Sequence, residues 1–250
     1  MKISFKKLLL IICIVLILIL ILVWAIFRSP EENTKTTKNQ QKDSRQTTKD
    51  SRPEDEIETP IPESYDIKVP FISQAPFGIW DELHDEACEE ASILLVHYFY
   101  QGINLTRERM DQDIRALVNY QIKKYGKHKD LTSQETADLA KEYFNYKDVG
   151  VVYDFSWEDL KKEIIQDHPV IIPAAGRLLG NPYFTAPGPV YHMLVIRGYN
   201  QTEVITNDVG TRRGESYTYT YDVLDQAIHD WTGSYDSILS GRRAFIVIND

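Results

Sequence analysis

Apolar residues after residue 60 follow a helical spacing first and a strand-like spacing later. Behind Cys88 they recur three and four positions apart until Gly102, which is the pattern of a helix with one buried face. Thr106 and either Thr132 or Ser133 are good helix caps, and each precedes another apolar stretch with helical spacing. This first half of the segment therefore predicts three helices, over 88–101, 106–125 and 133–144.

The second half of the segment is richer in short β-branched and aromatic stretches, which are typical of strands. Ser156 and Asp159 form a capping box that starts one further helix, which ends before Pro169. Another short helix is predicted over 223–231. The predicted strands cover 149–153, 170–174, 190–199, 204–207, 216–221 and 244–248. Helices followed by a largely antiparallel sheet make an α+β arrangement.

Residues 8–27 form an uncharged run of mostly Leu, Ile and Val, which is long enough to cross a bilayer as a helix. Residues 1–7 carry three lysines, so we expect them to stay in the cytoplasm while the rest of the chain is exported. A cleaved signal peptide is the alternative, but it needs small residues before the cut, and Trp24–Phe27 offers a poor site. The sequence therefore predicts an uncleaved, single-pass anchor in the cell membrane.

Residues 28–60 are rich in polar residues and cannot bury enough apolar surface to fold, so they are predicted to be a disordered linker. The remaining residues, 61–250, suffice for one globular domain. The formal net charge is -9 and no basic stripe is present, so nucleic-acid binding is not expected. The predicted domain holds one cysteine, Cys88, which rules out an internal disulfide and leaves a free thiol whose role needs an explanation.

Cys88 lies at the start of its predicted helix, where free backbone N–H groups and the helix dipole favour a thiolate. The acidic residues Asp85, Glu86, Glu89 and Glu90 surround it and favour the neutral thiol, so the sequence leaves the pKa of this thiol open. A cysteine taken by itself is more simply a buried structural residue. The other interpretation is a nucleophile, which needs a base, a group that orients the base, and donors for an oxyanion.

Each of those partners has a candidate in the sequence. His192 begins an apolar strand, so its ring can stand beside a cleft, although a histidine satisfied within the sheet is the simpler interpretation. Asp208 follows the next strand, and a hairpin would bring it beside His192 to hold the imidazole tautomer, although it is also a common turn residue. Gln74 can supply the amide of an oxyanion hole, or it is a solvated loop residue.

Four segments in this order resemble family thirty-nine of the cysteine peptidases, which includes the bacteriocin-leader (double-glycine) peptidases. The more similar branch is that of the stand-alone, exported bacterial proteins called "C39-like". The segments are Val69–Gln74, Ala87–Ser92, Tyr191–Tyr199 and Ile205–Gly210. The resemblance covers about Val69 to Asp250.

The resemblance implies a papain-like fold, in which N-terminal helices pack on a mainly antiparallel sheet, and a hydrolase that acts on a peptide or protein substrate. It implies Cys88 as nucleophile, His192 as base, Asp208 as orienting acid and Gln74 in the oxyanion hole. The chain departs from the family at Ala87, where Gly is frequent, but this change removes no catalytic group.

Three other interpretations stay open. A cell-wall endopeptidase or amidase of the Cys-His type uses the same order of residues, although no wall-binding repeat is present. A tethered, non-catalytic binding module of the same fold is expected to lose Cys88, His192 or Asp208, and all three are present. His84, Cys88 and His97 have a spacing that a metal site can use, but structural zinc needs four ligands, so no metal and no cofactor are expected.

The predicted topology can be tested on intact cells. Added protease is expected to digest everything beyond about Arg28, because the polybasic flank holds only the first residues inside. Immunoblotting against the C-terminus follows the digestion. A domain that is digested only after lysis would reverse the topology.

Overall fold

The computed structural model describes residues 60–249. The N-terminal residues 1–7, the predicted anchor at 8–27 and, apart from Pro60, the predicted linker at 28–60 lie outside the described residues. Across 60–249, no helix combines the length and the apolar character needed to cross a membrane.

After the two-residue strand β1 (Tyr65–Asp66), the helices come before the rest of the sheet, as the sequence predicts. They are α2 (Glu82–Asp85), α3 (Cys88–Gln101), α4 (Arg107–Tyr125) and α5 (Ser133–Phe144). Shorter helical segments come later, namely α6 (Trp157–Ile164), η1 (Gly176–Leu179), α7 (Tyr221–Ala227) and η2 (Tyr235–Ser240). The strands are β1 (Tyr65–Asp66), β2 (Asp148–Tyr153), β3 (Val170–Ala175), β4 (Tyr191–Tyr199), β5 (Glu203–Asn207), β6 (Tyr217–Thr220) and β7 (Ala244–Asn249).

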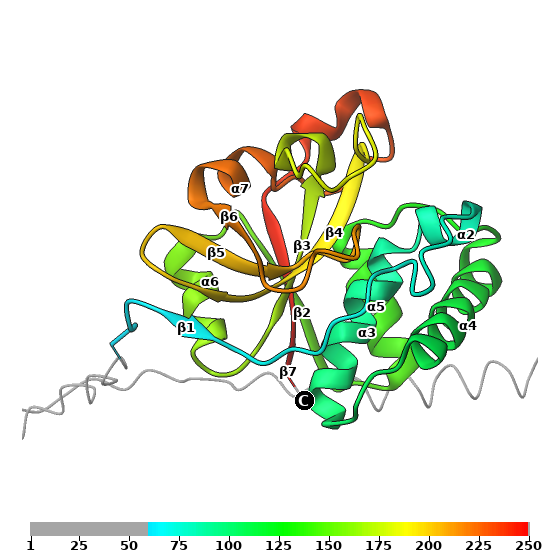
Figure 1. Ribbon diagram of the computed structural model, residues 1–250, viewed down its shortest axis with the longest axis horizontal. Helices are drawn as coiled ribbons and strands as arrows, with labels where there is room; N and C mark the ends of the chain where they lie inside the picture. The colour runs from blue at the N-terminus through cyan, green and yellow to red at the C-terminus, as the bar shows by residue number, and fades with distance from the viewer. Residues whose placement is uncertain (1–59, 250) are drawn as a thin grey trace, which may run out of the picture. The chain divides into compact units, whose positions relative to one another are not determined.

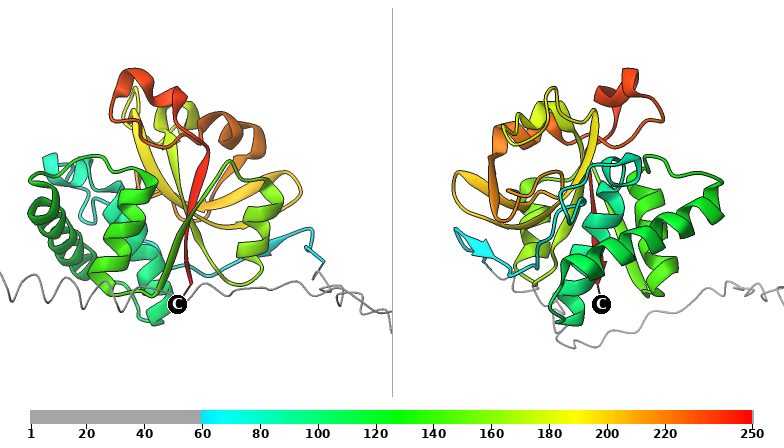
Figure 2. Two further views of the ribbon diagram at one scale, coloured as in Figure 1. Left: turned by 180° about the vertical axis from the view of Figure 1, so that it is seen from behind. Right: turned by 45° about the vertical axis from the view of Figure 1, so that its right-hand side comes forward.

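The described strands form one seven-stranded sheet in the order β2-β7-β3-β4-β5-β6, with β1 paired to β4. All the pairings in it are antiparallel. Helices α3, α4 and α5 gather on one side of the sheet, and α6 and α7 lie on the other (Figures 1 and 2). The domain therefore belongs to the α+β class that the sequence predicts.

Local signals set the helix ends where the sequence places them. The Thr106 side chain caps α4, and Gly126 ends that helix in the left-handed conformation. Thr132 with Glu135, and Ser156 with Asp159, form capping boxes at the starts of α5 and α6. These boundaries confirm the predicted ones.

Helix α3 is more deeply buried than its apolar spacing predicts. The pattern indicates one buried face, yet Glu89, Ile93 and Val96 are also fully buried. The reason is its position, since α3 contacts β3 and β4 of the sheet as well as α4 and α5. The acidic side chains of its first turn, Glu89 and Glu90, therefore lie inside the protein instead of at its surface.

Two predicted segments differ in detail from the elements that the structure forms. The extended stretch Val69–Gln74 forms no strand, and its end is held instead by the Gln74 N–H, which donates to the Val209 carbonyl at 2.9 Å. The helix predicted over 223–231 begins earlier, because the Thr220 side chain caps its first turn. It also ends earlier, at Ala227.

Gly214 is a point of close backbone contact, because a Cβ built there would lie 1.8 Å from the Asp208 carbonyl oxygen. Gly214→Ala is therefore expected to force this loop apart and lower the free energy of unfolding by about 1–3 kcal/mol. Urea unfolding followed by circular dichroism measures the change. Gly150→Ala is the control, since its Cβ would meet only Val247 at 4.0 Å, and a shift within about 0.5 kcal/mol is expected. Equal effects of the two substitutions would contradict the prediction.

Candidate active site

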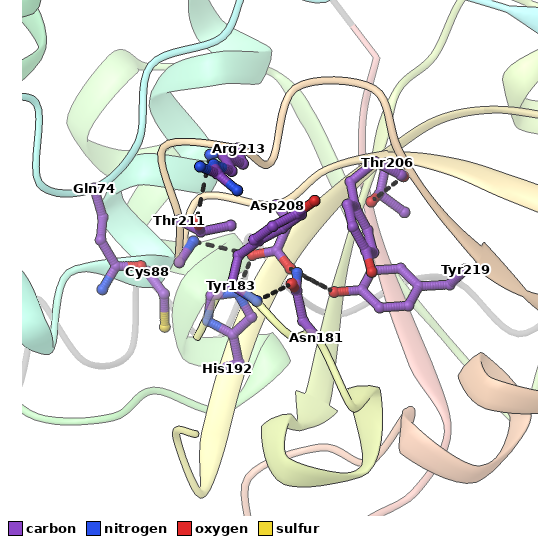
Figure 3. Close-up of polar contacts among 12 residues, drawn as sticks. Gln74, Cys88, Asn181, Tyr183, His192, Thr206, Asp208, Thr211, Arg213 and Tyr219 are labelled. Carbon is purple, nitrogen blue, oxygen red and sulfur yellow. Dashed lines mark hydrogen bonds and ion pairs between the residues drawn. The ribbon is translucent and has the colours of Figure 1, made fainter. Parts of the chain in front are cut away.

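Cys88 is the first residue of α3 and is a free, buried thiol. It lines a cleft of about 800 Å³ together with His192 and Gln74. The structure therefore brings three of the four predicted site residues to one cleft. The fourth, Asp208, lies fully buried behind the His192 ring (Figure 3).

His192 reaches the cleft because it is the second residue of β4. Strand β4 pairs with β5 in an antiparallel hairpin, in which Val195 faces Asn207. This register brings Asp208, the residue after β5, beside the histidine, and His192 Nε2 lies 2.8 Å from Asp208 Oδ1. The predicted proximity of these two residues is confirmed.

The Asp208 carboxylate receives donors on both oxygens. Oδ1 contacts His192 Nε2 and accepts from the Gly210 N–H at 3.0 Å. Oδ2 accepts from the Tyr219 hydroxyl at 2.6 Å and from Asn181 Nδ2 at 3.0 Å. Burial alone raises the pKa of Asp208, but His192 and these donors outweigh it, so its pKa lies below the usual value and the group stays ionised.

The Cys88 thiol faces a different partner. Its Sγ donates to the carboxylate oxygen Oε2 of Glu89 at 3.1 Å. Burial raises the pKa of Cys88 well above its ordinary value, and Glu89 raises it further, while the Met193 N–H lowers it. The sequence leaves this balance open, and the structure places it on the side of the neutral thiol. Among the described residues, no hydrogen bond joins the sulfur to the His192 ring.

Gln74 lies on the Cys88 side of the cleft (Figure 3). Its Nε2 donates to the carbonyls of His84 at 2.8 Å and Asp85 at 3.1 Å. Its Oε1 is buried and has no hydrogen-bond partner in the described part of the chain. The side chain is thus a fixed part of the cleft wall and not a solvated loop residue.

The histidines considered for a metal site have other partners. The His84 ring contacts Asp81 at 2.6 Å and Asp111 at 2.9 Å. His97 Nδ1 contacts the Tyr146 hydroxyl at 2.7 Å, and its ring stacks on Phe144. Residues 60–249 hold no cluster of three or more histidine, cysteine or acidic side chains arranged for a metal ion.

A protein-family model described as the Peptidase_C39 like family matches residues 66–238. The chain belongs to this family. Membership of the Peptidase_C39 like family suggests a peptidase, and it implies a peptide or protein substrate.

The chain is similar to a protein from Bacillus anthracis whose crystal structure is described as that of a C39-like peptidase. The TM-score of this match is 0.49 and the sequence identity is 18%. That match covers 76% of this chain and 99% of the other. No curated protein matches the chain.

Sequence reasoning missed three residues that shape this site of the Peptidase_C39 like domain. Tyr219 could have been found from the alternation of Tyr and Thr, because every second residue of a strand points to the same side. Asn181 lies in a long loop without any periodic signal. Glu89 stands in a run of acidic residues that indicates a solvated helix start, and nothing in the sequence separates a buried member from an exposed one.

Tyr219→Phe tests how far the hydrogen-bond donors around Asp208 keep this carboxylate ionised. The folded-state pKa of Asp208 is lowered, so its contribution to stability is present above its usual pKa and is lost as the pH falls through the folded value. Removing the hydroxyl donor is expected to raise the pKa of Asp208, cost about 1 kcal/mol or more at neutral pH and move acid unfolding to higher pH. Circular dichroism during acid titration measures this.

Tyr217→Phe is the matched control, because it removes the same atom from the same strand. The Tyr217 hydroxyl makes no hydrogen bond with any residue that the structure describes, so its acid-unfolding midpoint is expected to stay unchanged. An equal shift in both variants would mean that Tyr219 acts by packing alone.

Proposed function

We propose that this protein is a membrane-anchored, extracytoplasmic cysteine peptidase with a papain-like fold. In this proposal Cys88 attacks the peptide carbonyl, His192 accepts the thiol proton, and Asp208 orients the imidazole. The observation that carries it is the His192–Asp208 pair, which is 2.8 Å apart and stands at the cleft that Cys88 also lines. Family membership supports the same chemistry.

The charge on Asp208 assigns the histidine tautomer. An ionised carboxylate only accepts hydrogen bonds, so the ring proton stands on Nε2, which faces Asp208 Oδ1. The other ring nitrogen, Nδ1, is then left with the lone pair that a base needs. Because the pKa of the Cys88 thiol is raised, the proton passes to Nδ1 as the sulfur attacks and is not transferred beforehand.

The attack forms a C–S bond and places the carbonyl electrons on oxygen. The proposed donors for this oxyanion are the backbone N–H of Cys88, which as a first-turn amide has no partner within its helix, and the Gln74 amide. Since Gln74 Nε2 already donates to the His84 and Asp85 carbonyls, it must weaken one of these bonds to reach the oxyanion. The amine then leaves with the proton from His192, and water that His192 deprotonates hydrolyses the thioester.

The cleft has the mixed lining that a peptide needs. Its walls carry the aromatic residues Trp80, Tyr183, Phe184 and Tyr235, the acidic residues Asp85, Glu86 and Asp130, and the basic residues Arg212 and Arg213. Its volume of about 800 Å³ lies within the usual range for ligand pockets.

The proposed location rests on the sequence of the first 27 residues. The apolar run at 8–27 and the preceding lysines favour an anchor with its N-terminus in the cytoplasm. The catalytic domain is then outside, at the end of the polar linker 28–60.

A graded series of substitutions tests the proposed roles, with peptide cleavage followed by mass spectrometry. Cys88→Ser and His192→Ala are expected to lose nearly all activity, because a hydroxyl is a far poorer nucleophile and a thiol without its base stays protonated. Asp208→Asn is expected to keep part of the activity, since Asn can still orient the imidazole. Gln74→Ala is expected to lower turnover about a hundredfold. His168→Ala is the control.

His168 suits that purpose because its ring pairs with Glu163 at 3.0 Å and does not line the cleft. Two results would discard the assignment. One is full activity in Cys88→Ser, and the other is loss of activity with a chelator but not with a thiol alkylator. A wild-type chain that binds peptides without cleaving any would favour the binding module instead.

A further inference from the structure

Glu89 is a fully buried carboxyl group that the proposed mechanism does not use. Both of its oxygens have fixed positions. Oε1 accepts from the backbone N–H of Leu131 at 2.8 Å, and Oε2 accepts from Cys88 Sγ at 3.1 Å. The carboxyl therefore bridges the loop before α5 and the thiol at the start of α3.

We propose that Glu89 is a positioning residue that holds Cys88 as a neutral thiol, hydrogen-bonded away from His192, until the substrate is in place. This inference rests on the proposed function, since it concerns the protonation of the proposed nucleophile. It explains why the sulfur donates to Glu89 while the His192–Asp208 pair is already assembled.

The charges around the pair favour a neutral sulfur. From α3, Glu90 stands beside Glu89, and from the loop before α5, Asp130 acts on both Glu89 and Cys88. Burial is the main reason that the pKa of both groups is raised; Glu90 and Asp130 raise that of Glu89 further, whereas Glu89 and Asp130 raise that of Cys88. From β4, the Met193 N–H lowers the pKa of the thiol, and the Tyr191 phenol, whose own pKa is raised, adds no charge at neutral pH.

Groups further out do not reverse this balance. His128 Nε2 lies 3.6 Å from Glu90 Oε1, so its charge acts mainly on Glu90. The Tyr235 hydroxyl, from η2, donates to Asp130 at 3.1 Å. His192, also on β4, faces Asp208. No lysine or arginine contacts Glu89 among the residues that the structure describes, so a thiolate there would face the carboxylate without a compensating cation.

In the hydrogen bond that the structure describes, one proton lies between Sγ and Oε2. With the proton on sulfur, Cys88 donates to a carboxylate and is not nucleophilic. With the proton on Oε2, a carboxylic acid donates to a thiolate, and no other atom moves. Gln at position 89 imitates this second form, because its Oε1 can still accept from Leu131 while its Nε2–H donates to the sulfur.

The test measures the alkylation rate of Cys88 by iodoacetamide in the full chain, from acid to alkaline pH, with the Cys88 peptide quantified by mass spectrometry. In the wild type the midpoint of the profile is expected above that of an ordinary thiol. In Glu89→Gln the midpoint is expected to fall by about one unit or more, so the rate at neutral pH rises about tenfold or more. In Glu90→Gln the midpoint is expected to stay that of the wild type.

Glu90→Gln is a close control, because it makes the same change at the next buried position. Its carboxyl accepts from Gln121 Nε2 at 2.9 Å and not from the thiol. An unchanged or higher midpoint in Glu89→Gln would overturn the proposal, and so would an equal fall in both variants.

A second variant covers a failure of Glu89→Gln to fold, which circular dichroism reveals. Glu89→Asp keeps the charge but withdraws the carboxylate by one methylene, so the midpoint is expected to fall partway. A wild-type midpoint in Glu89→Asp would overturn the proposal. Labelling does not depend on peptide cleavage, so its result stands apart from that of Cys88→Ser in the peptidase assay.

Discussion

The buried carboxylate of Asp208 is the interaction on which the rest of the site depends. It joins β4 through His192, the following loop through the Gly210 N–H, β6 through Tyr219 and the segment after η1 through Asn181. A buried charge is unfavourable unless its hydrogen-bonding capacity is filled, so each of these four segments is constrained to meet at this point. The hairpin and the two loops of the cleft wall are thereby placed together.

The site contains a second buried carboxyl group, and a comparison of the two explains their different behaviour. Asp208 faces an imidazole and three further donors, so its ionised form is favoured. Glu89 faces one backbone N–H, a thiol and the negative field of Glu90 and Asp130, so its pKa lies above the usual value. Both are fully buried, so the number of donors and the sign of the neighbouring charges decide the pKa.

The sequence predicts the fold class and the ends of the main helices, because these follow from local signals such as the caps at Thr106 and Thr132. It also predicts that His192 and Asp208 meet, because a hairpin has few possible registers. It does not predict that Glu89 is buried, since that depends on how α4, α5 and the sheet surround α3. Asn181 is missed for a similar reason, because its place depends on the path of a long loop.

Cys88 and His192 belong to different layers of the molecule, the first on helix α3 and the second on strand β4. The two residues lie far apart in the sequence, so the position of the thiol relative to the imidazole depends on how α3 packs against β4. The side chains packed between α3 and β4 therefore set where the thiol lies relative to the imidazole. Under the proposed function, inserting or deleting a single methylene there would shift the thiol relative to the imidazole and so change the rate without altering any residue that a substrate touches.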